Sequence, residues 1–97
     1  MNDPIQISPK AREEIKHIMA HKNIPEGYGL RVGVQGGGCG VKFILGFDKE
    51  KSGDETYSID EIPVFIQKKE IMFLLGKEVD FYEGADARGF VFTDPDR

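Results

Sequence analysis

Residues 29–47 read GLRVGVQGGGCGVKFILGF, two alternating apolar segments on either side of a glycine run that contains the one cysteine of the sequence, Cys39. Apolar residues alternate with polar or small ones over residues 30–34, and the alternation resumes over residues 41–47. A period of two is typical of strands with one buried face. The stretch therefore predicts two neighbouring strands that are joined at the glycine run.

A helix is predicted upstream of this stretch, from Pro9 to His21. Ser8 and Pro9 are typical of an N-cap followed by the first helical residue, and apolar residues then recur at helical spacing. Pro25 and Gly27 interrupt the pattern. The apolar stripe of this helix requires a partner, and the predicted sheet supplies one.

Downstream, the patterns predict four more strands and a second, short helix. The strands are expected at residues 57–59, 62–66, 79–81 and 90–92. Ile71, Leu74 and Leu75 indicate the short helix, with Gly76 as its terminator. Pro63 indicates an edge strand or the start of a strand. This order of elements predicts a mainly β (α+β) fold, which we expect to form one domain over residues 1–97.

The composition limits both the class of protein that this sequence can encode and the kinds of partner that it is expected to bind. Of the 97 residues, 39% are hydrophobic and 31% charged, as in an ordinary globular protein. The net charge of -4 disfavours nucleic acid as a partner, because phosphate binding depends on Lys and Arg. No apolar run approaches the ~20 residues that span a bilayer, so no membrane partner is expected. The start of the sequence lacks the pattern of a signal peptide, and the single cysteine agrees with a reducing compartment, so a cytoplasmic location is expected.

Cys39 is the residue where chemistry is easiest to place, and several roles are open to it. A free cysteine most often acts as a small buried hydrophobe, but that role leaves the surrounding glycines unexplained. A reactive or ligating thiolate needs access and nearby donors, and a glycine-rich loop offers both. Ligation of iron or a cluster is one possibility, and a lone redox thiol is another. The run thus marks Cys39 as the candidate metal ligand.

Two catalytic or nucleotide-binding interpretations are disfavoured. The glycine run matches neither G-x-x-x-x-G-K-[ST] nor G-x-G-x-x-G, and a strand follows it where those motifs need a helix. A Cys-His hydrolase needs a base, and both histidines, His17 and His21, belong to the predicted helix. Their spacing of four residues suits metal ligands, but two solvated polar residues are the simpler interpretation.

The whole pattern resembles the A-type iron-sulfur carrier, or HesB/IscA-like, family. The order and spacing of several stretches carry the resemblance: Ile7–Ala11, Gly29–Val34, Gly38-Cys39-Gly40, Phe43–Phe47, Leu75–Phe81 and Gly89–Pro95. It implies a HesB-like sandwich or pseudobarrel of mixed β-sheets with two helices. It also implies a homodimer or tetramer that takes up iron or an iron-sulfur cluster and passes it to apoproteins, acting as a carrier or scaffold and not as an enzyme. The first family cysteine maps onto Cys39.

This sequence departs from the family pattern in two ways. Cluster-carrying members have a C-x-C pair near the C-terminus, so two of the three family cysteines are absent from these 97 residues. The usual Gly-Cys-Ser-Gly pattern also appears one residue shorter, as Gly38-Cys39-Gly40. With Cys39 as the sole candidate ligand, we expect weak or no stable cluster binding. The competing hypothesis is a cluster-free protein-interaction or regulatory module that keeps the fold.

Overall fold

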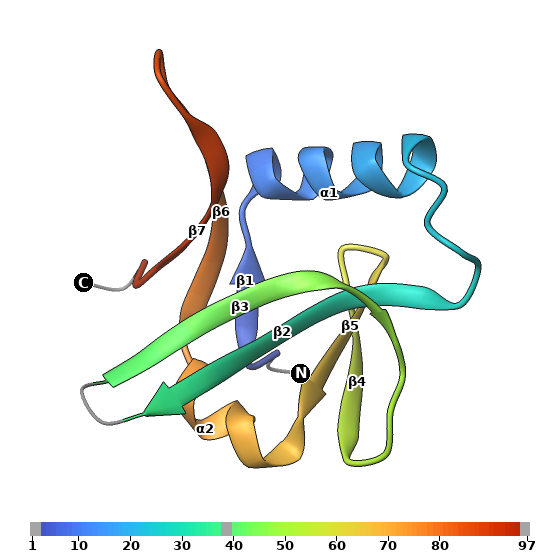
Figure 1. The fold of residues 1–97 in the computed structure, drawn as a ribbon, viewed down its shortest axis with the longest axis vertical. Coiled ribbons are helices and arrows are strands. Elements are labelled where there is room, and N and C mark those ends of the chain that lie inside the picture. The colour runs from blue at the N-terminus through green and yellow to red at the C-terminus, as the bar shows by residue number, and fades with distance from the viewer. Residues whose placement is uncertain (1–2, 38–39, 96–97) are drawn as a thin grey trace.

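A computed structural model describes residues 3–37 and 40–95 of the chain, and it contains two sheets and two α-helices (Figure 1). In chain order the elements are β1 (Ile5–Ile7), α1 (Pro9–His21), β2 (Tyr28–Gly37), β3 (Gly40–Lys49), β4 (Asp54–Ile59), β5 (Ile62–Gln67), a 3-10 turn η1 (Lys68–Glu70), α2 (Ile71–Leu74), β6 (Lys77–Glu83) and β7 (Arg88–Thr93). The predicted helix Pro9–His21 and the predicted strands are confirmed.

Both sheets are mixed. The larger has the order β3-β2-β5-β4, in which β2 and β5 run parallel and the other pairs are antiparallel. The smaller has the order β1-β6-β7, in which β1 and β6 run parallel. The predicted mainly β fold of mixed sheets with two helices is therefore confirmed. The strand β1, only three residues long, was not predicted.

The core lies where the two sheets and both helices meet. Its largest fully buried side chains come from six different elements: Ile5, Ile15, Leu30, Val32, Ile62, Val64, Ile66, Leu74 and Val79. The alternating inner face of β2 and the stripe of α1 both contribute to it, as their sequence periods predict. One buried cluster thus holds together elements that are distant in sequence.

Ser8 ties the start of α1 to β6. Its hydroxyl accepts a hydrogen bond from the N-H of Ala11 at 3.0 Å, as an N-cap does, and donates to Oδ1 of Asp80 at 2.7 Å. The bond from Ser8 is the main cause that lowers the pKa of Asp80. The side chain that caps the helix therefore also fixes the helix to the smaller sheet.

The structure tests two predictions for the second half of the chain, the position of Pro63 in its sheet and the end of the short helix. Pro63 is the second residue of β5, so the strand-start prediction is confirmed, but β5 lies between β2 and β4 and the edge prediction is wrong. Gly76 has a φ of 80° and ends the α2 region, as predicted. Leu75, in contrast, is 59% exposed and does not contribute to the core.

Candidate metal-binding hairpin

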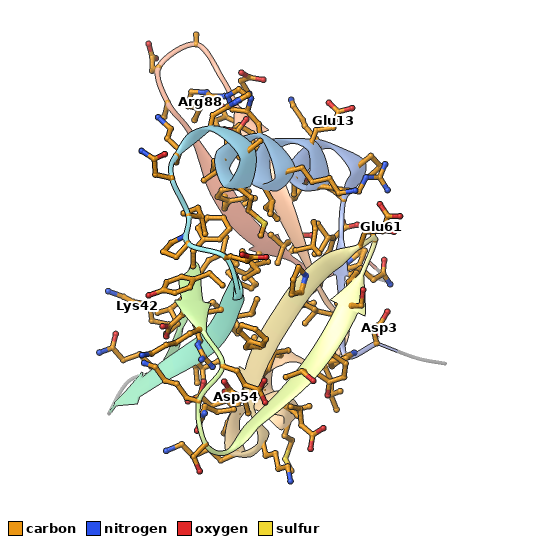
Figure 2. The ribbon with its side chains drawn as sticks, turned by 90° about the vertical axis from the view of Figure 1, so that its right-hand side faces the viewer. Asp3, Glu13, Lys42, Asp54, Glu61 and Arg88 are labelled. Atoms are coloured by element: carbon orange, nitrogen blue, oxygen red, sulfur yellow. The ribbon has the colours of Figure 1, made fainter. Side chains whose placement is uncertain are left out.

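The predicted ligand Cys39 belongs to the connection between β2 and β3, the longest strands of the fold. These strands form an antiparallel hairpin of ten residues each, and their register ends at the pair Gly37 and Gly40. Cys39 and Gly38 lie outside the described residues, so the structure does not place the thiol. Five described residues that flank this connection are exposed: Gln35, Gly36, Gly40, Val41 and Lys42. Figure 2 shows the Lys42 side chain directed away from the sheet.

The inner face of the hairpin packs on the smaller sheet. The rings of Phe43 and Phe92 are stacked, with centroids 5.1 Å apart and an interplanar angle of 26°. Nζ of Lys77 lies 5.3 Å from the Phe43 centroid and 2.6 Å from Oδ1 of Asp94. Aromatic pairs of this kind contribute about 1 kcal/mol beyond their buried area. The contact holds β3 against β7 close to the end of the hairpin.

Glu70 supports the hairpin from the side of β2 that faces α2. Its Oε1 accepts a hydrogen bond from the N-H of Val34 at 3.0 Å. Gly33 makes this approach possible, because a Cβ at that position would lie 2.6 Å from the same oxygen. No pattern in the sequence indicated this role for Glu70, since its partner is 36 residues away.

We expect Glu70→Ala to leave the N-H of Val34 without its acceptor and to destabilise the protein by about 1–2 kcal/mol. Glu70→Gln keeps an oxygen at the same position and should cost less than half as much. Urea unfolding measures both variants, and amide exchange at Val34 should accelerate at least several-fold in the alanine variant. Equal stability of the two variants would contradict this role.

A buried ion pair fixes the opposite end of the hairpin. Both terminal nitrogens of the Arg31 guanidinium donate to the Asp54 carboxylate, with Nη2 2.8 Å from Oδ2. The Asp54 side chain is fully inaccessible to solvent. Asp54 also accepts bonds from Nε2 of Gln67 at 2.6 Å and from the N-H of Lys51 at 2.7 Å. Asp48 on β3 lies 3.4 Å from Nε of Arg31. The network therefore links β2, β3, β4 and β5.

The network also shifts the ionisation of its members. The hydrogen bond from Arg31 lowers the pKa of Asp54 to about 2 although burial opposes the charged form. The same bond is the main cause that raises the pKa of Arg31. A hydrogen bond with Lys51 is the main cause that lowers the pKa of Asp48. Arg31 and Asp54 thus remain charged through the neutral range and hold the base of the hairpin.

The two histidines do not approach the described part of the hairpin end. His17 and His21 are exposed on α1, with ring centroids 4.4 Å apart in an edge-on arrangement. Figure 1 shows α1 well separated from the point where β2 ends and β3 begins. Over residues 3–37 and 40–95, no three His, Cys, Asp or Glu side chains are grouped so that they could hold a metal ion. The interpretation of the histidines as solvated residues fits this placement.

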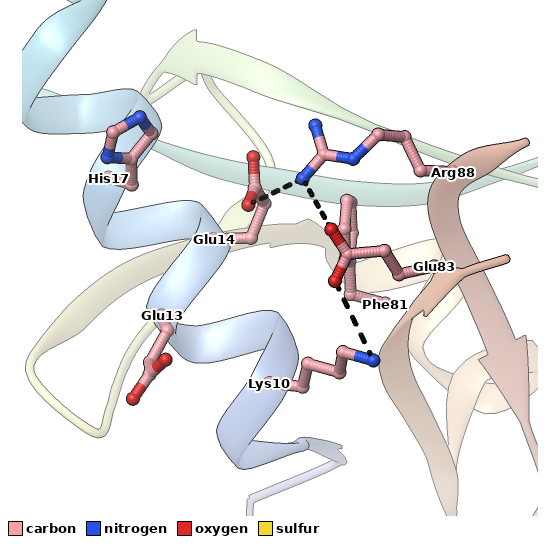
Figure 3. A pocket seen from close by; sticks show the side chains of 7 residues that line it. All are labelled: Lys10, Glu13, Glu14, His17, Phe81, Glu83 and Arg88. Carbon is pink, nitrogen blue, oxygen red and sulfur yellow. Dashed lines mark hydrogen bonds and ion pairs between the residues drawn. The ribbon is translucent and has the colours of Figure 1, made fainter. Parts of the chain in front are cut away.

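An open pocket of about 410 Å³ lies between α1 and the smaller sheet (Figure 3). Four of its charged side chains pair with one another: Nη2 of Arg88 lies 3.4 Å from Glu14 and 3.3 Å from Glu83, and Nζ of Lys10 lies 3.9 Å from Glu83. The Arg88 guanidinium also lies 4.9 Å from the centroid of the Phe81 ring. Because these groups satisfy each other at an exposed site, the pocket carries no functional assignment.

Comparison with known proteins identifies the class to which this fold and hairpin belong. The model of the family described as "Iron-sulphur cluster biosynthesis" matches residues 4–96, so the chain belongs to that family. The resemblance inferred from the order and spacing of several sequence stretches is confirmed. In the described residues, no helix has the length and apolar character needed to cross a membrane.

Individual relatives agree with this assignment. The chain is 39% identical over 93 residues to the mitochondrial iron-sulfur cluster assembly 1 homolog of Danio rerio, covering 94% of this chain and 70% of that protein. It matches the crystal structure of Escherichia coli SufA, involved in biosynthesis of iron-sulfur clusters, with a TM-score of 0.78 and 28% identity over 96% of this chain and 82% of SufA. A crystal structure of IscA with a [2Fe-2S] cluster shares the fold, with a TM-score of 0.76 and 23% identity over 94% of this chain and 85% of IscA.

Proposed function

We propose that this protein is a carrier or scaffold of iron-sulfur cluster assembly that binds iron or a cluster weakly through Cys39 and passes it to apoproteins. The observation that carries the proposal is the family match over residues 4–96, because it includes the glycine run with the single cysteine. In this proposal the protein moves its cargo and is not an enzyme. Its partners are other assembly proteins and apoprotein clients.

The number of thiolates supports weak binding. A [2Fe-2S] cluster is normally held by four protein ligands, most of them cysteines. One chain of this sequence offers a single thiolate, and a homodimer offers one from each copy. Carboxylates, histidines, a small thiol or the client protein would have to complete the ligand set. A site of this kind exchanges its cargo more readily than a closed site of four cysteines.

A second candidate is a cluster-free interaction or regulatory module with the same fold. The observation that favours it is the exposure of three apolar side chains in and after α2: Met72 at 78%, Phe73 at 53% and Leu75 at 59%. Exposed apolar groups that lie close together often mark protein contacts. The cytoplasmic location expected from the sequence remains a prediction, and the curated relative in Danio rerio is named as mitochondrial.

Anaerobic reconstitution with iron and sulfide separates these proposals. For the native chain we expect visible absorbance that corresponds to clearly less than one [2Fe-2S] cluster per dimer, and we expect desalting to remove most of it. Cys39→Ser should abolish the residual signal. A stoichiometric cluster that survives desalting would contradict weak binding, whereas identical signals from both proteins would favour the cluster-free module.

A further inference from the structure

The two histidines of the sequence are neighbours on one face of α1. His17 and His21 are four residues apart in this helix, and side chains at this spacing lie one turn apart on the same face. Both are exposed, and their ring centroids lie 4.4 Å apart. Apart from this ring contact, neither side chain forms a hydrogen bond or an ion pair with a described residue. Their ring nitrogens are therefore available to a ligand from solvent.

The separation of the two rings is close to the one that a shared metal ion requires. A histidine nitrogen ligates a metal at about 2.1 Å, which places the centroid of its ring about 3.2 Å from the ion. For an angle of about 90–110° between the two bonds, the centroids of two such rings lie about 4.5–5.2 Å apart. The observed 4.4 Å is at the short end of this range. Small rotations of the rings are thus sufficient for both to ligate one ion.

The surroundings of His17 on the helix favour a cation. Its neighbours at three and four residues are Glu14, Glu13, Ala20 and His21, so no Lys or Arg occupies these positions. Figure 3 shows Glu13 and His17 projecting from the same side of α1. Glu13 forms no ion pair with a residue of the described ranges, so no cation of the protein neutralises it there. Its carboxylate adds negative charge about one turn from the two rings.

We propose that His17 and His21 chelate a divalent ion of the late first-row transition metals, Cu²⁺, Ni²⁺ or Zn²⁺, with water in the other positions. Imidazole suits these ions, and the affinity of such ligands rises from Fe²⁺ to Cu²⁺. Within residues 3–37 and 40–95, no third His, Cys, Asp or Glu side chain is grouped with the pair. Two or more coordination positions therefore stay open, so the ion can exchange or accept a ligand from a second molecule.

The pair carries no catalytic base. In the helical H-E-x-x-H motif of metalloproteases, two histidines at the same spacing ligate zinc, and the Glu after the first histidine acts as the general base. Residues 17–21 read HIMAH, so an isoleucine takes the place of that Glu. The site therefore binds a metal ion without the group that metal-dependent hydrolysis needs.

This site is separate from Cys39 and does not rest on the proposed carrier function. Figure 1 shows α1 well separated from the point where β2 ends and β3 begins. Of the ions considered, Fe²⁺ is the one that a pair of imidazoles binds most weakly. Iron supplied for Cys39 is therefore expected to leave the histidine pair unoccupied, and the pair should bind its metal equally well in Cys39→Ser.

Calorimetric titration of the full chain with CuCl₂ tests the site. The Cys39→Ser variant is used throughout, so that the thiol can neither ligate nor reduce the ion. We expect one Cu²⁺ per chain with a Kd in the micromolar range. His17→Ala and His21→Ala should each raise the Kd at least about tenfold, because the second imidazole otherwise binds at a high effective concentration. Anaerobic titration with Fe²⁺ should give a Kd at least about tenfold higher than that for Cu²⁺.

His21→Ala combined with Lys22→His is the matched control. It keeps two histidines in the chain but places them five residues apart, where they no longer share a helix face. Its Kd should equal that of His21→Ala, and circular dichroism verifies that each variant is folded. Electron paramagnetic resonance of the Cu²⁺ complex should show two imidazole nitrogens for the original pair and one for the control.

Two results would overturn the proposal. One is equal affinity of the original pair and the control, which would mean adventitious binding by single side chains. The other is a Cu²⁺ spectrum with fewer than two imidazole nitrogens for the original pair. Because every sample lacks the thiol of Cys39, neither result bears on the carrier function.

Discussion

Asp54→Asn is expected to reduce the free energy of unfolding by about 3 kcal/mol, because it removes the negative charge and one of the two acceptor oxygens that face the guanidinium of Arg31 in a largely buried site. Arg31 is only 14% exposed, and the Asp54 side chain is fully inaccessible. Asp48 lies 3.4 Å from Nε of Arg31 and still balances part of its positive charge in the variant. The expected loss of stability is therefore at the low end of the range for broken buried ion pairs. Urea unfolding followed by circular dichroism measures the loss. A domain of this size should lose about 15 °C in Tm.

Glu55→Gln is the matched control for Asp54→Asn. Glu55 is the next residue of β4, and its side chain is 42% exposed beside Lys68 at 3.4 Å. The loss of such an exposed pair should change stability by less than about 0.5 kcal/mol. Similar losses in both variants would contradict the assignment of stability to the buried network.

The native protein should also lose stability in acid through Asp54. The pKa of this carboxyl is lowered to about 2 in the folded protein and is near 3.9 in an unfolded chain. Its contribution of about 2.5 kcal/mol is therefore complete above about pH 5 and is lost as the pH falls from about 5 through 2. Asp54→Asn should show a shallower decline of stability in this window.

Gly29→Ala is expected to cost about 3 kcal/mol, the second large effect. A Cβ at Gly29 would lie 2.7 Å from the carbonyl oxygen of Pro63 and 2.9 Å from its Cβ. These atoms belong to β5, the parallel neighbour of β2, and a backbone atom cannot move aside as the end of a side chain can. The two strands would have to separate, and overpacking of this kind is destabilising.

Gly46→Ala provides the comparison on the same hairpin. The position is open, so an added methyl meets nothing within 4 Å. At concentrations where the chain is monomeric, the alanine should be neutral or stabilising by up to about 1 kcal/mol, since it restricts the unfolded chain. Thermal unfolding of the two variants should differ by more than 10 °C in Tm. Equal values would contradict the close approach of β2 to Pro63.

Local signals in the sequence predicted most of the elements. Ser8 and Pro9, the apolar period after them and the breakers at Pro25 and Gly27 were enough to give the bounds of α1. The alternation on both sides of the glycine run gave the β2–β3 hairpin. Three residues of β1 are too few for a period, and their partner β6 is some 70 residues away, so this strand and the division into two sheets depend on contacts that no local pattern contains.

The supporting residues of the candidate site were less predictable than the hairpin itself. Arg31 occupies the polar side of an alternating strand, where a solvated charge is the ordinary expectation, yet it pairs with a buried carboxylate 23 residues away. Glu70 follows two lysines in the sequence and therefore resembles a surface residue. In the structure its carboxylate reaches β2, because Gly33 has no side chain to block it. The glycine run and the order of motifs identified the family, and Cys39 itself lies outside the described residues.

X-ray absorption at the iron edge tests the central claim most directly, namely that Cys39 is the ligand through which this chain holds iron. The sample is concentrated protein, kept anaerobic, with less ferrous iron than protein and no added sulfide, so that cysteine is the one expected source of strong sulfur scattering. The native chain should show iron-sulfur scattering that is absent in Cys39→Ser. Identical spectra from the two proteins, with oxygen and nitrogen scattering alone, would contradict the claim.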